Sequence, residues 1–331
     1  MAYDSIRLEK GLYTTGKGFT RALEELDPSE NYIGTELEGL DAYQRQLKRF
    51  DIKVSGKGAD TVSKFFQTSD SAALFPEYVS RAVAQGIMQD DSIDKLVAAT
   101  TEINSLDYRA VQTVSDDESL GLKDIAEGAF IPETHIRLKD SLTPLKKRGR
   151  MLVASYEAIK FQSLDLFTAV LSQIGMAISK AQFGDLIECL TGSGVQTIDR
   201  SSATVDYTHL VELWNEFSPY RMTSLITSGG VLSTLLNLSE FKDSNAGLNF
   251  HATGDMITPL GAQIIKSPTT DLGGTIIGLD NRYAVEKVQA GGVITDFDKL
   301  IDRQLERATI TTITGFSRIC DDAVKILETQ A

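Results

Sequence analysis

The chain has 331 residues, a length that corresponds to about two domains. Its composition, 42% hydrophobic and 24% charged, is that of an ordinary globular protein, and it contains no run of about 18 apolar residues that could form a membrane-spanning helix. The formal net charge of −13 argues against tight binding to DNA, because nucleic-acid-binding surfaces gather Lys and Arg to neutralise phosphates.

Residues 1 to about 62 are polar and punctuated by glycine, and they contain only short helical patterns, at 19–26 and 40–50. These patterns lack apolar stripes long enough to build a core of their own. The segment therefore predicts an extended arm that docks on other parts of the chain or on other subunits. We expect the arm to be retained in the assembled protein, and residues 54–60 to form a linker.

The character of the chain changes at Phe65 and Phe66, where apolar residues begin to recur. A helix is predicted from Phe75 through Ile87, because Pro76 is pre-organised for a first helical turn. A strand is predicted next, at residues 100–103.

Residues 108–153 form a hairpin-like excursion. Its far strand, 133–139, alternates between an apolar side with Ile136 and Leu138 and a polar side, the period of a half-buried strand. The turn region, 115–119, is acidic and polar. Because a lone two-stranded ribbon is at best marginally stable in water, we expect the excursion to fold back on its own domain or to lie on another copy of the chain, and we favour the second copy, as in an assembly protein.

A long helix follows the excursion. Ser163 is a suitable N-cap and Asp165 complements the helix dipole in the first turn. Apolar residues then recur every three or four positions up to Ala181, which predicts one buried face on a helix that reaches about Leu190, roughly 40 Å long. The glycines of residues 191–194 end it.

Residues 205–295 read as a second unit. Helices and strands alternate imperfectly there, with strands predicted at 221–227, 262–265 and 275–278, and this favours a mixed sheet over a doubly wound parallel one. In the tail, 307–327, apolar residues fall every third position, which suggests a helix, but the β-branched content predicts a strand, and we choose the strand.

Several short motifs, taken in order, carry a resemblance to a known family. Residues 126–132 read AEGAFIP, 142–146 read LTPLK, 152–157 read LVASYE, and the helix ends in Asp185, two apolar residues and Gly192-Ser193-Gly194. This order resembles the extended-loop region and spine helix of tailed-phage major capsid proteins of the Hong Kong 97 type. One departure is Ala126, where the family often has an aromatic residue.

The resemblance implies an α+β fold, Hong Kong 97-like, with peripheral domain, spine helix, axial domain, extended β-hairpin loop and N-terminal arm. The implied division is 1–64 for the arm, 65–107 for the first part of the peripheral domain, 108–154 for the extended loop, 155–204 for the spine helix and peripheral domain, 205–295 for the axial domain, and 296–331 for the return strand and C-terminus.

The resemblance also implies a function. A major capsid protein self-assembles into the icosahedral head that encloses phage double-stranded DNA. The implied partners are copies of the chain in hexamers and pentamers, a portal protein, and a scaffold or decoration protein; no membrane partner is implied. The implied location is the virion, after synthesis in the cytoplasm of the host bacterium.

Residues that could carry catalysis or bind a metal are few. His135, His209 and His251 lie in different predicted elements without metal-ligand spacing. We interpret Cys189 and Cys320 as buried thiols of a protein made in a reducing cytosol. The first residues of the given sequence, which show no secretory-signal pattern, agree with this interpretation. Residues 228–230, Ser-Gly-Gly, match neither phosphate-loop pattern and are interpreted as a turn. No catalytic residue, cofactor or metal is predicted.

One basic run stands out in this acidic chain, and we predict that it is an intersubunit contact. The run comprises Lys146, Lys147, Arg148 and Arg150, and its complement is the acidic tip of the extended loop, Asp116, Asp117 and Glu118. The alternatives are a phosphate-binding patch, a solvated strand end and an ion-pair partner for an acidic neighbour.

Some relatives join subunits through a lysine of the extended loop. Lys123 and Lys139 lie in this loop, but lysine is common, and we predict no covalent bond from them.

Two rival functions remain open at this stage. An encapsulin-type nanocompartment shell shares the fold but holds enzymes in place of a genome, and a cytosolic α/β enzyme with an unrecognised site belongs to another class. The length of the chain and its long N-terminal arm favour the phage capsid. Electron microscopy separates a shell from a small globular enzyme.

We expect that deletion of residues 115–122, the tip of the extended loop, leaves a folded subunit that no longer forms shells. The tip is too polar to contribute to its own domain's core, but it can lie across a neighbour. Circular dichroism would report folding and negative-stain microscopy would report assembly. Normal shells from the deletion variant would show that the loop is not an intersubunit clamp.

Overall fold

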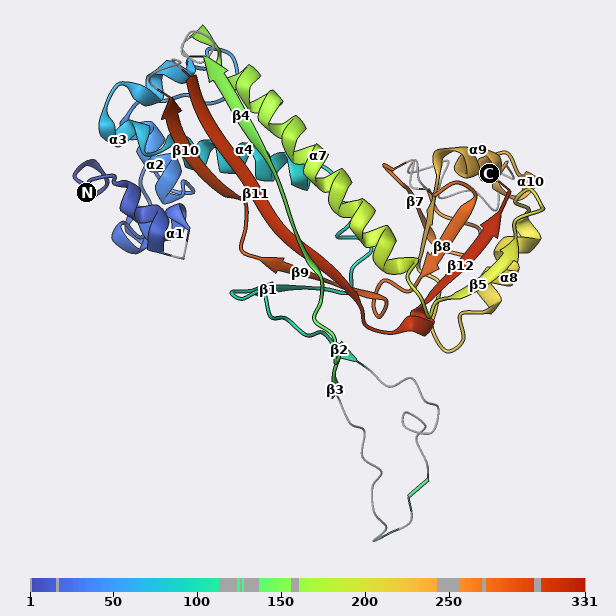
Figure 1. The fold of residues 1–331 in the computed structure, drawn as a ribbon. Coiled ribbons are helices and arrows are strands. Elements are labelled where there is room, and N and C mark those ends of the chain that lie inside the picture. Colours follow the sequence, from blue (N-terminus) through green and yellow to red (C-terminus); the bar gives the residue numbers. More distant parts are fainter. Residues whose placement is uncertain are drawn as a thin grey trace. The chain divides into compact units, whose positions relative to one another are not determined.

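A computed structural model gives the fold of the chain (Figure 1). It describes residues 2–15, 18–112, 124–125, 127, 137–155, 161–242, 256–269, 272–300 and 305–330. The chain forms two compact units. The first consists of Met1–Asp90, Arg148–Ile178 and Val293–Thr312, and the second of Asp91–Lys147, Ser179–Gly292 and Ile313–Ala331. These units are defined by packing alone, and the six domain ranges predicted above stay a prediction.

The first unit is mainly helical. Its own helices are α1 (Phe19–Leu26), α2 (Ala42–Arg49), α3 (Ser69–Ala72) and α4 (Phe75–Met88). It also holds the first half of α7 (Leu164–Leu190), most of β4 (Leu145–Ser155), β10 (Ile294–Leu300) and the start of β11 (Leu305–Arg318). β10 and β11 pair antiparallel and run side by side in Figure 1.

The predicted helices of this unit are confirmed, and their local signals explain their bounds. α4 begins at Phe75 with Pro76 in its first turn, as expected. α2 begins after Asp41, whose side chain accepts a hydrogen bond from the backbone N–H of Gln44 while the Gln44 side chain accepts from the Asp41 N–H. This reciprocal capping box satisfies two donors that a helix start leaves free.

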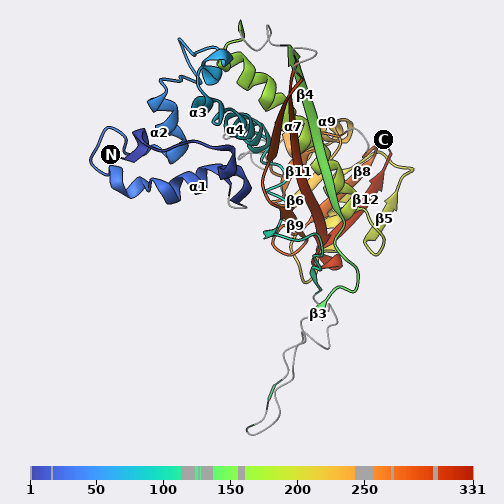
Figure 2. The ribbon, with the colours of Figure 1, turned by 60° about the vertical axis from the view of Figure 1, so that its left-hand side comes forward.

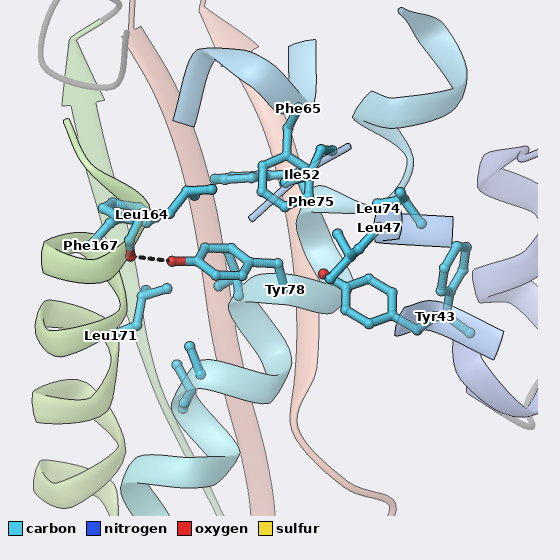
Figure 3. Packing of buried hydrophobic residues seen from close by; sticks show 14 of the residues in the cluster. Tyr43, Leu47, Ile52, Phe65, Leu74, Phe75, Tyr78, Leu164, Phe167 and Leu171 are labelled. Atoms are coloured by element: carbon cyan, nitrogen blue, oxygen red, sulfur yellow. Dashed lines mark hydrogen bonds between the residues drawn. The ribbon is translucent and has the colours of Figure 1, made fainter. Parts of the chain in front are cut away.

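The core of the first unit lies where α4 packs on α7. Phe75 and Tyr78 of α4 stack on Phe167 of α7, with ring centroids 6.1 and 6.3 Å apart (Figure 3). The Tyr78 hydroxyl donates to the carbonyl oxygen of Leu164 at 2.8 Å, the dashed line in Figure 3. Burial of this hydroxyl raises the pKa of Tyr78 to about 12, so the phenol stays protonated near neutral pH and can donate this bond.

The N-terminal residues join the same core. Phe19, Leu23, Tyr43 and Leu47 are buried in one hydrophobic cluster with the side chains of α4 and α7. Arg81 of α4 reinforces this contact, because its guanidinium donates to residues 20, 41 and 77 and lies 4.4 Å above the Tyr43 ring. The short helices of the N-terminal segment are therefore stabilised by burial against α4.

A buried ion pair fixes the internal arrangement of that segment. Arg45 is fully buried, and its Nε donates to Oδ2 of Asp27 at 2.9 Å. The guanidinium also donates to the carbonyl oxygen of Leu40 and stacks on the Tyr32 ring at 4.4 Å. Because a buried charge is costly unless it is paired and hydrogen-bonded, these contacts hold the turns on both sides of Arg45 in one arrangement.

The second unit contains a five-stranded sheet. Its strands are β5 (Gln196–Arg200), β6 (Ser224–Thr227), β7 (Gln263–Lys266), β8 (Thr275–Leu279) and β12 (Val324–Thr329), in the order β5-β12-β8-β6-β7. β12 is parallel to β5 and antiparallel to β8, and β6 is antiparallel to β8 and parallel to β7. The predicted mixed sheet is confirmed, and Figure 2 shows β5, β12 and β8 side by side.

The inner strands of this sheet, β12, β8 and β6, are buried on both faces, whereas the edge strand β5 is mostly exposed. On one face, Ile226 and Ile277 pack with Leu186 of α7. On the other, Leu225 and Ile276 pack with residues of α8 (Tyr207–Asn215) and α9 (Gly229–Leu236). A short helix, α10 (Ser239–Lys242), follows α9. Neighbouring residues of a strand point to opposite faces, which is why these strands read as continuous apolar runs.

A second group of strands lies in the same unit. β1 (Ala99–Ile103) is parallel to β9 (Val285–Ala290), and β9 is antiparallel to residues 314–318 of β11. β2 (Val111–Gln112) and β3 (Arg137–Leu138) form a separate two-stranded ribbon. The predicted tail strand is confirmed as β11 and β12, with a short 3₁₀ turn at Asp321–Ala323 between them.

The crossing of α4 and α7 depends on two glycines, and we expect Gly175→Ala to destabilise the first unit. A Cβ at Gly175 would lie 2.2 Å from the carbonyl oxygen of Val83, and one at Gly86 would lie 2.2 Å from that of Ser172. Overpacking of this kind costs about 1–3 kcal/mol. Urea unfolding would measure the loss.

Gly184→Ala in the same helix is the matched control. A Cβ at Gly184 meets only the methyl group of Thr269, at 3.9 Å, so the gain in helix propensity should leave stability equal or higher by up to about 1 kcal/mol. Equal stability of the two variants would contradict the close crossing.

Candidate intersubunit contact site

The base of the segment predicted to be the extended loop is an antiparallel ribbon. Its near side is 108–112 and its far side 137–143. The backbone N–H of Lys139 donates to the carbonyl oxygen of Ala110, and that of Thr143 donates to Tyr108, each at 2.9 Å. Of the predicted far strand, β3 covers residues 137–138, and residues 133–136 lie outside the described part of the chain.

Tyr108 anchors the near side of the base to β9. Its hydroxyl donates to Oε1 of Glu286 at 2.7 Å, and the hydroxyl of Thr101 on β1 donates to the same oxygen. Burial and then the Glu286 hydrogen bond raise the pKa of Tyr108. The phenol therefore remains protonated and neutral at physiological pH, so that it can donate to this buried carboxylate.

Lys139 anchors the far side to β11. Its Nζ donates to the carbonyl oxygen of Arg318 at 2.6 Å and to Oγ of Ser317 at 3.2 Å. The half-buried ammonium is thus held within its own chain. Lys123, the other lysine considered for a covalent link, lies outside the described residues.

Lys146, the first residue of the predicted contact, forms two ion pairs with α7. Its Nζ lies 2.6 Å from Oε2 of Glu188 and 2.9 Å from Oδ1 of Asp185. The hydrogen bonds to Glu188 and then to Asp185 raise the pKa of Lys146. Asp185 and Glu188 are three residues apart and lie on one side of the helix, so a single ammonium reaches both.

The C-terminal end of α7 needs cations from other segments. The last turn of α7 contains no basic residue, although the partial negative charge of a helix C-terminus favours one. Lys146 supplies one cation, and Arg318 of β11 supplies a second, donating to the carbonyl oxygens of Gly192 at 3.1 Å and Ser193 at 2.7 Å. The loop base and β11 therefore neutralise the end of the helix.

These residues surround a cavity of about 350 Å³. Its lining carries side chains of both charges, among them Lys139, Lys146, Asp185 and Arg318. Cys189 also lines it, and burial raises the pKa of this thiol, which disfavours the reactive thiolate. The charged side chains of the lining are held by ion pairs and hydrogen bonds, an arrangement that suits anchoring of the loop.

The predicted basic cluster is thus divided by its surroundings. Lys146 pairs within its own chain, and Arg148 also has an interaction. Lys147 and Arg150 are exposed on β4 and have no ion pair with another described residue. The acidic complement, Asp116, Asp117 and Glu118, lies outside the described residues, so the contact between the two patches stays a prediction.

Apolar side chains are exposed around the loop base. Leu138, predicted on the apolar side of a half-buried strand, is 61% exposed. The ribbon of β2 and β3 has no third strand among the described residues, which explains why Leu138 is not covered. Leu106 and Leu142 of the same unit are also exposed, and in the first unit so are Met151 and Val153 on β4.

The remaining candidate residues have structural roles. His209 lies in the first turn of α8, where its Nδ1 accepts a hydrogen bond from the Asp206 N–H at 3.2 Å, and Ser228 caps α9. His135 and His251 lie outside the described residues. Within the described part of the chain, no group of His, Cys, Asp and Glu could hold a metal ion, and no helix is long and apolar enough to cross a membrane.

The ion pairs of Lys146 were not predicted from the sequence, because they join residues 39 or more positions apart. The only local signal was the pair Asp185 and Glu188 on one side of a helix end that lacks a cation.

Comparison with known proteins shows which family and which solved structures the chain is similar to. A family model described as phage capsid protein matches residues 139–322. No curated protein sequence matches the chain. Among solved structures, the virus-like particle from Pyrococcus furiosus is similar with a TM-score of 0.53 and 15% identity, over 76% of this chain and 98% of that one.

Two further structures are similar. The capsid of a native GTA particle has a TM-score of 0.54 and 14% identity, over 76% of this chain and 91% of that one. A structure from Gordonia phage Cozz has a TM-score of 0.51 and 16% identity, over 72% of this chain and 86% of that one. At these identities the likeness concerns the fold, and it confirms the Hong Kong 97-like α+β fold expected from the sequence.

We predict that Lys146→Met lowers the free energy of unfolding by about 1–2 kcal/mol, because Asp185, whose side chain is 8% exposed, loses a charged partner. Lys147→Met is the matched control on the same strand and should change stability by less than about 0.5 kcal/mol. Urea unfolding followed by circular dichroism measures both. Equal effects would contradict the role of Lys146 as an anchor.

A comparison of the natural chain with Lys146→Met also tests the dependence of this stabilisation on pH. Because the pKa of Lys146 is raised in the folded chain, its stabilising contribution is fully present below 10.5, the ordinary pKa of lysine, and is lost as the pH rises through the folded pKa. The difference between the natural chain and Lys146→Met should therefore narrow above that pH. A difference independent of pH would show that the ammonium charge is not responsible.

Proposed function

The chain belongs to the phage capsid protein family, and on this premise we propose that it works as the major capsid protein of a tailed phage, whose copies close into an icosahedral head around double-stranded DNA. The observation that carries the proposal is the family match over residues 139–322. The matched range begins at the base of the extended loop and includes α7 and most of the two sheets. The function is structural, and the family is not one of enzymes.

The proposed partners are copies of the same chain, in hexamers and pentamers, together with a portal protein and a scaffold or decoration protein. The subunit would be made in the cytoplasm of the host bacterium and end in the virion. The net charge of −13 is compatible with enclosing DNA without gripping it, because exposed charges are screened beyond about 8 Å at physiological salt.

We also propose the domain assignment that the family implies. Residues 108–154 would be the extended loop, 205–295 the axial domain and 1–64 the arm, with the peripheral domain and spine helix formed by 65–107, 155–204 and 296–331. The clear base of the loop at Tyr108 and Thr143, closed by a backbone hydrogen bond, supports its first boundary.

Electron microscopy of the purified chain tests the function. We expect closed shells of uniform size, and small globular particles would overturn the proposal. Particles recovered from phage-producing cells would then be treated with nuclease. Protected double-stranded DNA supports a phage head, whereas shells filled with protein in place of DNA would indicate an encapsulin-type compartment.

For the contact between subunits, we propose that the acidic loop tip, Asp116, Asp117 and Glu118, meets Lys147 and Arg150 of a neighbour. These two cations are exposed, while Lys146 and Arg148 of the same run already have contacts. Exposed pairs contribute about 0–1 kcal/mol each, so the contact would guide register and assembly rate more than subunit stability.

Charge reversal tests this contact. Lys147→Glu with Arg150→Glu should slow assembly, measured by light scattering, with little change in the melting temperature of the subunit. Adding Asp116→Lys and Asp117→Lys should restore part of the rate. Failure of this rescue, or unfolding of the first variant, would show that the basic run belongs to the subunit's own surface.

A further inference from the structure

One face of α7 is exposed and largely apolar. Leu166, Val170 and Met176 on this face are 57%, 42% and 43% exposed. Ala169, Gln173 and Ala177 complete the face and are also exposed. We call these six residues the outer stripe. A solvent-facing helix surface normally carries charged residues, and contiguous exposed apolar patches mark contacts with other molecules.

The order of residues in the outer stripe is self-complementary about Gln173. Val170 and Met176 lie three residues before and after it, and Ala169 and Ala177 lie four before and after it. If two copies of α7 pack antiparallel across a two-fold axis at Gln173, each Val170 faces a Met176 and each Ala169 faces an Ala177. In such an isologous contact the same surface serves both partners.

Charges at the two ends of the stripe are complementary in the same arrangement. Asp165 precedes the stripe and Lys180 follows it, and both are exposed without an ion pair to another described residue. In the antiparallel pair, Asp165 of one copy comes next to Lys180 of the other at both ends. The aliphatic part of Lys180 can then cover Leu166 while its ammonium reaches the carboxylate.

Gln173 would fix the register. On the two-fold axis, the side-chain amides of the two copies can each donate to the carbonyl oxygen of the other. A single polar residue at the centre of an apolar helix contact specifies alignment, as a buried Asn does in coiled coils. Shifting the helices by one turn would leave both amides against apolar side chains.

We propose that the outer stripe of α7 is a two-fold contact with a second copy of this chain, antiparallel and centred on Gln173. The proposal rests on the proposed function, in which copies of the chain build a shell. One helix pair buries less than the roughly 1,200–2,000 Å² of a stable interface. The contact is therefore weak between isolated subunits and acts through its repetition in a closed assembly.

Disulfide trapping tests the geometry. Shells of Gln173→Cys, oxidised and run on a denaturing gel without reductant, should shift from monomer to dimer. Shells of Ala169→Cys alone should remain monomeric, because its partner position is Ala177. Co-assembled Ala169→Cys and Ala177→Cys chains should again give dimers. Oxidised shells of the natural chain, which retain Cys189 and Cys320, give the background.

A monomeric Gln173→Cys chain in intact shells would overturn the contact, and so would equal trapping at Gln173 and at Ala169 alone. Attachment of the cysteine to a different protein would assign the stripe to that partner and overturn the two-fold contact. If the natural chain forms no shells, the proposed function fails. The same disulfide trapping in a concentrated solution of the chain then tests the two-fold contact by itself.

Charge reversal gives a second, independent measurement. Lys180→Glu should reduce the yield of shells without a shift in melting temperature, and adding Asp165→Lys should restore it. Lys242→Glu, the same reversal at an exposed lysine of α10, should leave the yield unchanged. A double variant that stays as poor as Lys180→Glu, or an equal loss from Lys242→Glu, would contradict the proposed pairing.

Discussion

The fold depends on α7 being buried along its length by two different sets of side chains. Leu164, Phe167, Leu171, Ile174 and Ile178 belong to the core of the first unit. Phe183, Leu186 and Leu190 belong to the core that covers one face of the five-stranded sheet in the second unit. Within each set, the buried apolar residues recur every three or four positions, but Ile178 and Phe183, where the two sets meet, are five positions apart. A helix of 27 residues buried in this way gains most of its stability from packing.

Much of this could be predicted from the sequence, because the signals are local. Pro76 marks the start of α4, the acidic first turn and the glycines after Leu190 bracket α7, and β-branched residues identify the strands of the tail. The tail was ambiguous because Ile310, Ile313 and Phe316 fall every third residue. The buried side chains of β11 instead alternate, at Ala308, Ile310, Thr312 and Thr314, and Ile313 between the last two is only partly buried.

Long-range contacts could not be predicted. The basic run was expected to meet a neighbouring subunit as a whole, but Lys146 reaches Asp185 and Glu188 of its own chain, and no spacing in the sequence indicates that distance. The exposure of Leu138 has a related cause. Alternation predicts which side of a strand is apolar, but not whether this chain supplies the layer that covers it. In a protein that assembles from copies, an apolar side that is predicted as buried can be covered by a neighbouring subunit and not by its own chain.

The strong contacts of this chain therefore lie inside the subunit, and the weak ones lie on its exposed surface. The buried pair of Arg45 with Asp27 stabilises the first unit, and the partly exposed ion pair of Lys146 with Asp185 stabilises the second. The exposed residues, among them Lys147, Arg150 and the outer stripe, can each contribute only a small free energy. A closed shell makes that smallness useful, because many weak contacts together give a stable assembly, while a single wrong contact is weak enough to dissociate and be corrected. A subunit with one surface of high affinity for another copy would form stable dimers before a shell could close.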